Sequence, residues 1–314
     1  MSILIDALDA SSAASVSPLP AGPILVATGG ETDDDDALRA AWALAGRTGA
    51  DVELLSVVPP LTLIAEPAAI PMLPVDGWEG RRHARLAAVQ AQLRRTCPSE
   101  CEWPVTVVAG TVGEAIAEYA RSRHPRLVVM GRGRHRLARR LVAPESVLQV
   151  LRLADVPVLA VEPDATALPH RVVIATDFST YSTYAGRVAL SLVAPTAIVY
   201  LVHVRPEPPA GVLPAAQWTR AYDESLPGTF AKLQEQLAAP SGVQMDTVTL
   251  TGDPTPALIE FAAQSRADLV VSATHGRGFV DRLMLGSVAA GLLRAAPCSF
   301  LCVPGRMASA GDAR

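Results

Sequence analysis

Aromatic residues make up only 4% of the 314-residue chain, and basic residues are not in excess, since 27 Lys and Arg stand against 31 Asp and Glu. Few aromatic rings leave little for unpaired bases to stack on, and a net charge of −4 creates no general attraction to nucleic acid or anionic lipid. Long apolar runs are also missing. The longest uncharged stretch, between Arg187 and Arg205, is interrupted by Pro195 and His203 and does not form a membrane span. We therefore expect neither nucleic acid nor a membrane as a partner.

Cysteine is scarce: the chain has four, in two pairs with the spacing C-x3-C. Cys298 and Cys302 lie in a strand-like run, where residues four apart are separated by roughly 13 Å, too far for a disulfide. We interpret these two, and Cys97 with Cys101, as buried or incidental thiols rather than a redox or metal site. Residues 1–22 contain no basic residue and so lack the start of a secretion signal. Together these features predict a protein of the reducing cytoplasm.

Aliphatic sequence is abundant, and it is organised as a repeat. Apolar residues make up 50% of the chain and charged residues 18%, which is typical of soluble globular domains. Four segments recur in the same order in the two halves: ILVAT as VVIAT, LLSVV as YLVHV, LVVMG as LVVSA, and VPVLAV as CSFLCV. The repeat predicts two domains, 21–163 and 171–305, joined by a linker at 164–170 and flanked by tails at 1–20 and 306–314.

The recurring segments are continuous apolar runs, which are typical of strands buried on both faces. Stretches with helical spacing alternate with them, such as the apolar face formed by Ala185, Val188 and Leu192. Asp253 is predicted to cap the helix that follows it. This alternation predicts two tandem doubly wound α/β domains, each a five-stranded parallel sheet with helices on both faces.

The second copy contains a candidate nucleotide site at the carboxyl ends of its strands, where open parallel sheets bind ligands. Polar residues and glycines follow its first and fourth strands and begin its last helix: Asp177, Thr274, His275, Gly276, Gly286 and Ser287. A helix N-terminus offers N–H groups and partial positive charge to phosphate oxygens, and glycine lets the backbone approach them closely. The Asp177 carboxylate is placed to accept from a ribose hydroxyl or to help fix a base, and the Ser287 hydroxyl adds a donor.

Several segments of the second copy carry a family resemblance: TDFS at 176–179, LVHV at 201–204, GDP at 252–254, ADLVVSATHGRG at 267–278 and LGSVAAGLLRAAPC at 285–298. Over almost the whole of both copies, the chain resembles the universal stress proteins, also called the UspA-like family. The resemblance implies an adenine nucleotide alpha hydrolase-like fold and a domain that binds ATP, with Mg²⁺ as a candidate companion ion. It also implies dimerisation, and slow ATP hydrolysis at most rather than enzymatic turnover.

The ATP-binding branch of that family has the signature G-x2-G-x9-G-S/T, and the second copy matches three of the four positions, with Ala273 in place of the first glycine. A methyl group there either crowds the ligand or only excludes backbone angles with positive φ. Carried over by position, the resemblance implies the binding residues Ala175, Thr176, Asp177, Val204, Ala273, His275, Gly276, Gly286, Ser287 and Val288. It assigns no catalytic and no metal-binding residue.

The first copy departs further from the signature. Gly131 keeps the first glycine and Arg134 replaces the second, while Gly29 stands where the second copy has an aspartate. Pro144 and Glu145 replace the Gly-Ser pair. They suit a helix start, but proline has no N–H to donate and glutamate opposes a phosphate. We predict a scaffold domain that does not bind ATP in the family manner. The alternative is an anionic ligand or partner on the arginines of its arm: Arg132, Arg134, Arg136, Arg139 and Arg140.

Two further features have alternative interpretations. The acidic run Asp33–Asp36 is either a divalent-cation site or a set of acidic residues at the positive end of a helix, and the second is favoured because hard-cation loops space their ligands. His203 and His275 fall near the proposed site as candidate general bases, but no nucleophile or partner carboxylate is evident beside them.

Three functions are open at this point. The first is a tandem universal stress protein in which domain 2 binds ATP as a regulatory signal and domain 1 is a degenerate scaffold or dimerisation partner. The second is an interaction module without nucleotide, whose domains or chains pack through the strands near 158–161 and 300–303. The third, a nucleotide hydrolase or transferase, lacks a P-loop lysine motif and a clear acid–base pair. The expected partners are ATP or a related adenine nucleotide, the neighbouring domain, and a second copy of the chain as a homodimer.

Overall fold

The computed structural model describes residues 19–60, 77–98, 101–132, 139–165, 168–208, 214–274 and 286–305, with the backbone alone described at 139–144. Strands and helices alternate through both halves of the chain, as the repeat predicts. The elements of the first half, domain 1, are β1 (Ile24–Ala27), the short 3-10 helix η1 (Thr32–Asp34), α1 (Asp35–Thr48), β2 (Val52–Val58), α2 (Trp78–Thr96), β3 (Val105–Ala109), α3 (Val112–Arg123), β4 (Leu127–Gly131), α4 (Arg139–Leu153) and β5 (Val158–Val161).

The second half, domain 2, repeats this order without the 3-10 helix. Its elements are β6 (Arg171–Ala175), α5 (Thr180–Leu192), β7 (Ile198–Arg205), α6 (Ala215–Leu237), β8 (Gln244–Thr251), α7 (Pro254–Gln264), β9 (Leu269–Ala273), α8 (Ser287–Ala295) and β10 (Ser299–Val303). Asp253 caps α7 as predicted, because its carboxylate accepts from the Thr255 N–H at 3.2 Å. None of the helices in the described ranges has the length and apolar character that a membrane crossing requires.

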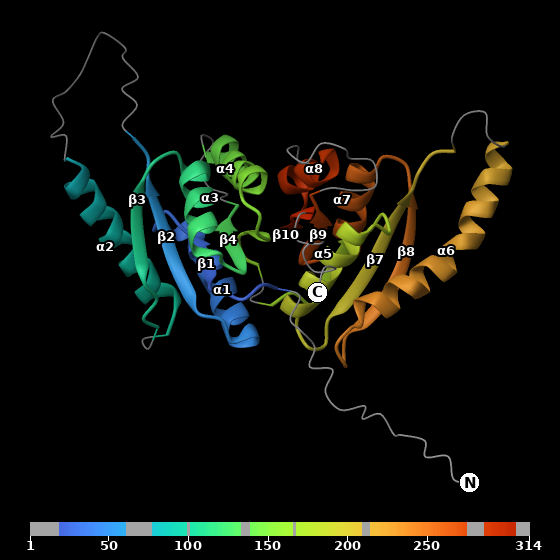
Figure 1. The fold of residues 1–314 in the computed structure, drawn as a ribbon, viewed down its shortest axis with the longest axis horizontal. Coiled ribbons are helices and arrows are strands. Elements are labelled where there is room, and N and C mark those ends of the chain that lie inside the picture. The colour runs from blue at the N-terminus through green and yellow to red at the C-terminus, as the bar shows by residue number, and fades with distance from the viewer. Residues whose placement is uncertain are drawn as a thin grey trace, which may run out of the picture.

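All ten strands form one sheet, in the order β3-β2-β1-β4-β5-β10-β9-β6-β7-β8. Neighbouring strands are parallel within each half, whereas β5 and β10 pair antiparallel, with Leu159 opposite Leu301. Figure 1 shows β9 and β10 near the middle of the molecule and α2 and α6 on its two outer flanks. The predicted fold class is confirmed: each half is a doubly wound, five-stranded parallel sheet covered by helices on both faces.

Two hydrophobic cores lie on opposite faces of this sheet. One contains buried side chains of α1, α2, α5 and α6, such as Leu38, and the other contains those of α3, α4, α7 and α8, such as Ile116. Strand residues alternate between the two, because successive side chains point to opposite faces. Both cores cross the β5–β10 pair: Leu159 and Leu301 belong to the first, and Phe300 to the second.

Backbone hydrogen bonds show that the alignment of β2 with β7, as the sequence repeat predicts it, is wrong by one residue. Thr28 N–H donates to Leu55 O at 3.0 Å, and Thr176 N–H donates to Val202 O at 2.9 Å. Leu55 therefore corresponds to Val202, whereas the match of LLSVV with YLVHV paired it with Leu201. A run of aliphatic residues buried on both faces carries little information about register, which explains the error.

The helix predicted to begin at Pro144 begins earlier. α4 starts at Arg139, so Pro144 lies inside the helix, where its missing N–H removes one internal hydrogen bond. The preceding residues RRLVA are mostly strong helix formers, which favours the earlier start.

Candidate functional site

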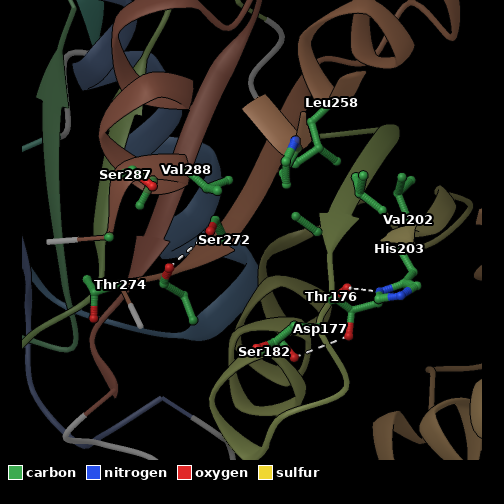
Figure 2. Close-up of a pocket in the computed structure, with 16 residues that line it drawn as sticks. Thr176, Asp177, Ser182, Val202, His203, Leu258, Ser272, Thr274, Ser287 and Val288 are labelled. Atoms are coloured by element: carbon green, nitrogen blue, oxygen red, sulfur yellow. Dashed lines mark hydrogen bonds between the residues drawn. The ribbon is translucent and has the colours of Figure 1, made fainter. Parts of the chain in front are cut away.

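A cavity of about 270 Å³ opens between β6 and β9, where the strand order of domain 2 reverses. Its walls come from the carboxyl ends of β6, β7 and β9, the first turn of α8, and α7. Open parallel sheets bind ligands at this position, because the connections on either side leave toward opposite faces. Figure 2 shows the side chains that converge on it.

Most of the predicted binding residues line this cavity: Ala175, Thr176, Asp177, Val204, Ala273, Gly286, Ser287 and Val288. The other two, His275 and Gly276, lie outside the described residues. Sequence reasoning missed Pro254 and Leu258, which form the α7 wall. Apolar residues at helical spacing indicate a core, and no sequence signal separates those that border a cavity from those that pack.

The loop after β6 is held by a network around Asp177. Its Oδ1 accepts from the Ser179 N–H at 3.1 Å and from Ser179 Oγ at 2.6 Å. Ser179 is also the N-cap of α5 and accepts from the Ser182 N–H at 3.2 Å. Phe178 adopts a left-handed φ of 59°, and its N–H donates to Thr176 Oγ1 at 3.0 Å. This turn fixes Asp177 at the cavity, with one carboxylate oxygen already bonded to the chain.

His203 holds the same loop from β7. It is buried, and its Nδ1 lies 2.8 Å from Thr176 O while its Nε2 lies 2.8 Å from the Tyr222 hydroxyl. A carbonyl only accepts, so Nδ1 carries a proton, and in the neutral ring Nε2 accepts from the tyrosine. Both ring nitrogens are therefore used to position the β6 end. In domain 1 the corresponding residue is Ser56, whose hydroxyl donates to Thr28 O at 2.6 Å.

The first turn of α8 forms the side of the cavity opposite the Asp177 loop. Gly286 N–H donates to Thr274 O at 2.9 Å, and a Cβ on Gly286 would lie 2.9 Å from the same oxygen. The closeness of Thr274 O therefore requires glycine at position 286. Because the Gly286 N–H already donates to this oxygen, it does not serve as a donor to a ligand. Among the described residues, no partner engages the N–H groups of Ser287, Val288 and Ala289, which line the cavity. Amides in the first turn of a helix attract anions, because their partial positive charges add to the helix dipole.

Ala273 replaces a glycine of the family signature without straining the backbone. It ends β9 and pairs with Val303 of β10, and it is not among the residues with positive φ. Of the two effects open to a methyl group at this position, backbone strain is thus excluded. Ala273 lines the cavity, and its side chain packs against the hydrophobic core that contains α5.

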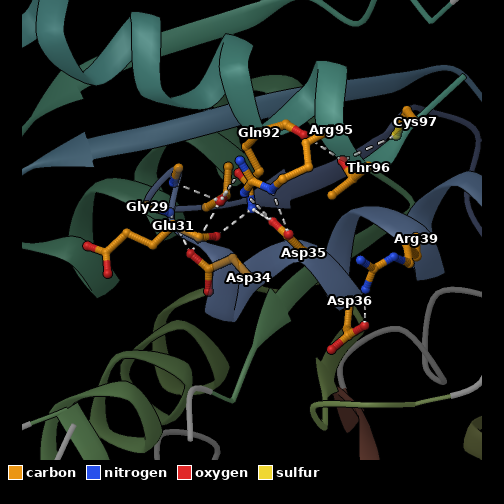
Figure 3. A network of polar contacts seen from close by, with 12 residues as sticks. Gly29, Glu31, Asp34, Asp35, Asp36, Arg39, Gln92, Arg95, Thr96 and Cys97 are labelled. Atoms are coloured by element: carbon orange, nitrogen blue, oxygen red, sulfur yellow. Dashed lines mark hydrogen bonds and ion pairs between the residues drawn. The ribbon is translucent and has the colours of Figure 1, made fainter. Parts of the chain in front are cut away.

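A second cavity, of about 210 Å³, lies at the same place in domain 1, between the ends of β1 and β4. Asp34 lines it, and its Oδ2 accepts from the Gly29 N–H at 2.7 Å and from Thr28 Oγ1 at 3.2 Å (Figure 3). Arg85 of α2 donates to Gly29 O at 3.0 Å. A carboxylate therefore stands at the switch point of domain 1.

Asp34 corresponds to Ser182 of domain 2, whose hydroxyl lies 3.2 Å from Thr176 Oγ1. Gly131 corresponds to Ala273, and a Cβ on Gly131 would lie 2.7 Å from Asp34 Oδ1. The glycine that domain 1 keeps from the signature therefore makes room for a carboxylate. The presence of this glycine in domain 1 is therefore not a sign of a phosphate site.

Glu145 does not supply the negative charge that its position predicted. Its carboxylate is exposed and pairs with Arg294 of α8 at 3.3 Å, away from the cavity, which Ser146 lines instead. Among the described residues, the carboxylate that lines the domain 1 cavity is that of Asp34. The helical periodicity explains the difference, because adjacent residues of a helix point about 100° apart and α4 begins earlier than predicted.

The acidic run Asp33–Asp36 spans the 3-10 helix η1 and the start of α1, and the carboxylates of Asp34, Asp35 and Asp36 have separate partners (Figure 3). Asp35 pairs with Arg95 at 2.7 Å, while Asp36 pairs with Arg39. Within the ranges that the structure describes, no group of three His, Cys, Asp or Glu side chains is arranged to hold a metal ion. The arrangement supports the helix-start interpretation of the run.

The four cysteines are free thiols. Burial raises the pKa of Cys101 and Cys298 to about 12, and it also raises the pKa of Cys97 and Cys302. A thiol is reactive as its thiolate, so these raised pKa values support the interpretation of buried, unreactive cysteines.

The family model described as the universal stress protein family matches this chain twice, at residues 21–162 and 169–304. The chain belongs to the universal stress protein family. It is similar to a universal stress protein of Methanocaldococcus jannaschii, with 34% identity over 140 residues, which are 43% of this chain and 82% of that protein.

Two solved structures share the tandem fold. A universal stress protein from Archaeoglobus fulgidus has a TM-score of 0.60 and 18% identity, over 90% of this chain and 96% of that one. A protein of unknown function from Pseudomonas aeruginosa has a TM-score of 0.64 and 15% identity, over 92% of this chain and 94% of that one.

Proposed function

We propose that this universal stress protein binds ATP or a related adenine nucleotide in the domain 2 cavity, and that binding acts as a regulatory signal in the cytoplasm rather than as a step of turnover. Domain 1 serves as a scaffold. The observation that carries the proposal is the arrangement across one cavity of the first-turn amides of α8 and the carboxylate of Asp177. An anion-binding end and a hydroxyl-binding end fit the two polar parts of a nucleotide.

The cavity offers a different chemistry to each part of the ligand. Val202, Val204 and Leu258 provide an apolar wall for a base. Asp177 accepts hydrogen bonds from ribose hydroxyls or a base amino group, and the N–H groups that begin with Ser287 receive phosphate oxygens. Since the described residues contain no ready metal site, a Mg²⁺ ion accompanying ATP is coordinated mainly by phosphates and water.

Domain 1 disfavours the same ligand for an electrostatic reason. Asp34 places a carboxylate at its switch point, and Gly29 leaves no side chain where Asp177 stands in domain 2. A polyphosphate there meets the like charge of Asp34, although Arg85 also lines the cavity, and it lacks the acceptor that Asp177 provides for hydroxyl groups. This supports the assignment of one nucleotide site to the chain.

The geometry of the domain 2 cavity favours slow ATP hydrolysis at most. The imidazole of His203 is bonded at both nitrogens, and the chain's one lysine, Lys232, lies in α6, outside the cavity. Catalysis of phosphoryl transfer needs a group that orients the attacking water and cations that neutralise developing charge.

The sharpest test is the variant Ser287→Asp. A carboxylate in the first turn of α8 is favourable for the helix itself, by about 0.3–1 kcal/mol, but it repels phosphate. We expect the melting temperature without ligand to be retained, and the Kd for ATP measured by isothermal titration calorimetry to rise at least about tenfold, which is ~1.4 kcal/mol.

The matched control is Ala216→Asp, which adds the same charge to the first turn of α6, an exposed position outside the cavity. It should bind ATP like the wild type. Equal loss of affinity in both variants would remove the site assignment. No retention of ATP by the wild type in equilibrium dialysis at millimolar concentration would instead favour the interaction-module function, and rapid phosphate release would favour a hydrolase.

A further inference from the structure

Domain 1 contacts the far end of α8, the helix that begins at the domain 2 cavity, through Arg132, in addition to the exposed Glu145–Arg294 pair. Arg132 directly follows β4, and its Nη2 donates to Leu293 O at 2.7 Å, in the last turn of α8. Its Nη1 donates to Ala296 O at 2.9 Å and to Cys298 O at 2.8 Å, just beyond the helix. Glu162 pairs with the same guanidinium at 3.0 Å. Arg132 thus joins the carbonyl end of α8 to the switch-point strand of domain 1, instead of contacting an anionic ligand as its place in the arm suggested.

The contact between Arg132 and α8 is largely buried and is not a pairing of exposed side chains. The Arg132 side chain is only 12% exposed, and its backbone N–H is fixed by Val161 O at 2.9 Å. The planar guanidinium can satisfy several carbonyl groups at once in a fixed geometry, which a lysine cannot reproduce. Carbonyl groups at the end of a helix lack intrahelical donors, so a buried helix end needs a partner of this kind.

The contact is also asymmetric between the two halves. The residue of domain 2 that corresponds to Arg132 is Thr274, which follows β9 in the same way. Its hydroxyl accepts from the Gly305 N–H at 3.0 Å, within its own domain. Among these described contacts, then, only one of the two helices α4 and α8 has its carbonyl end bound by an arginine of the other domain. It is α8, the helix whose first turn lines the candidate nucleotide cavity.

We propose that Arg132 is a positioning residue for the nucleotide site of domain 2: by holding the last turn of α8 from domain 1, it sets the place of the first turn at the cavity. The inference rests on the proposed function. α8 has nine residues and is therefore about 13 Å long, so Arg132 does not touch the ligand. A short helix moves as a rigid body, and a shift at its carbonyl end is passed to the amides at its other end. Domain 1, although it does not bind ATP, thereby contributes to the affinity of domain 2.

The test compares three variants: Arg132→Met, which keeps the length of the stem and removes the donors, Arg132→Lys, and Arg294→Ala. The last removes the exposed Arg294–Glu145 pair between α8 and α4, and so controls for loss of any contact between the domains. Circular dichroism first establishes that each variant is folded well below its melting temperature. Titration calorimetry then measures the Kd for ATP, and hydrogen–deuterium exchange without ligand reports on the hydrogen-bonded amides of 290–293 in α8.

We expect Arg132→Met to raise the Kd about 5- to 10-fold, in the range of ordinary coupling between sites. Arg132→Lys should recover part of the affinity, and Arg294→Ala should match the wild type. In the absence of ATP, exchange at 290–293 should be faster in Arg132→Met than in Arg294→Ala. If Arg132→Met does not fold, Arg132→Lys carries the comparison.

A folded Arg132 variant with wild-type affinity and wild-type exchange at 290–293 would overturn the inference. Failure of the proposed function looks different: the wild type itself then binds no ATP. In that case the exchange experiment still decides about Arg132, because it is made without ligand. Equal rates at 290–293 in Arg132→Met and Arg294→Ala would count against a positioning role.

Discussion

At the ends of β4 and β9, one pair of positions carries different residues in the two domains. Domain 1 has Asp34 with Gly131, and domain 2 has Ser182 with Ala273. The carboxylate of Asp34 approaches the strand so closely that a Cβ on Gly131 would lie 2.7 Å from its Oδ1. The smaller serine leaves room for a methyl group. The choice of glycine at 131 and alanine at 273 thus follows from the size of the neighbouring side chain, Asp34 or Ser182. The same neighbour decides whether the cavity carries a negative charge.

This pairing predicts non-additive stabilities at the residue scale. Gly131→Ala should lower the free energy of unfolding by about 1–3 kcal/mol, because the new methyl group overpacks against Asp34. In an Asp34→Ser background, Gly131→Ala should lower the free energy of unfolding by a smaller amount, the difference being ~1 kcal/mol or more. Urea unfolding of the wild type, the two single variants and the double variant measures this coupling. Additive costs would mean that another neighbour requires the glycine.

Among the elements, α8 connects most of the features of the candidate site. Its first turn lines the cavity, its N-cap Gly286 bonds to Thr274 O, and its carbonyl end is held by Arg132. The helix is short, and an isolated helix of this length is not stable in water, so its position depends on these contacts and on its buried face. Its two ends are therefore the places where substitutions should affect function.

We expect Gly286→Ala to shift the start of α8, because the added Cβ would lie 2.9 Å from Thr274 O, a backbone atom that cannot rotate away. The melting temperature and the ATP affinity should both fall. Gly228 in α6 provides the control, since a Cβ there meets nothing within 4 Å. Gly228→Ala should raise the free energy of unfolding by about 0.5–1 kcal/mol, because alanine is the better helix former. Similar melting temperatures for the two variants would contradict this account of Gly286.

On the scale of the whole molecule, the antiparallel pair of β5 and β10 makes the two domains one sheet with two shared cores. We expect a single cooperative unfolding transition in scanning calorimetry, with equal calorimetric and van't Hoff enthalpies, because neither half can open without exposing core residues of the other. Addition of ATP should move this single transition upward as a unit. Two separate transitions, with only one shifted by ATP, would show that the halves unfold independently.

Much of the fold and part of the site could be predicted from particular residues. The cap at Asp253, the parallel sheets and the place of Asp177 and Gly286 at strand and helix ends all follow from local patterns, and the structure brings them together as expected. The register of β2, the α7 wall and the start of α4 could not be predicted, since aliphatic runs and good helix formers leave these details open.

The amino-acid sequence by itself determined the tandem repeat, the α/β class, and which copy keeps the glycines and the aspartate of a nucleotide site, because these depend on residue type and spacing along the chain. Only the tertiary structure decided that Asp34 rather than Glu145 lines the domain 1 cavity, and that the Arg132 guanidinium donates to carbonyl groups at the end of α8. The physical reason is that both outcomes depend on the direction of a side chain toward partners from another part of the chain. That direction is set when distant elements pack, and no local pattern records it.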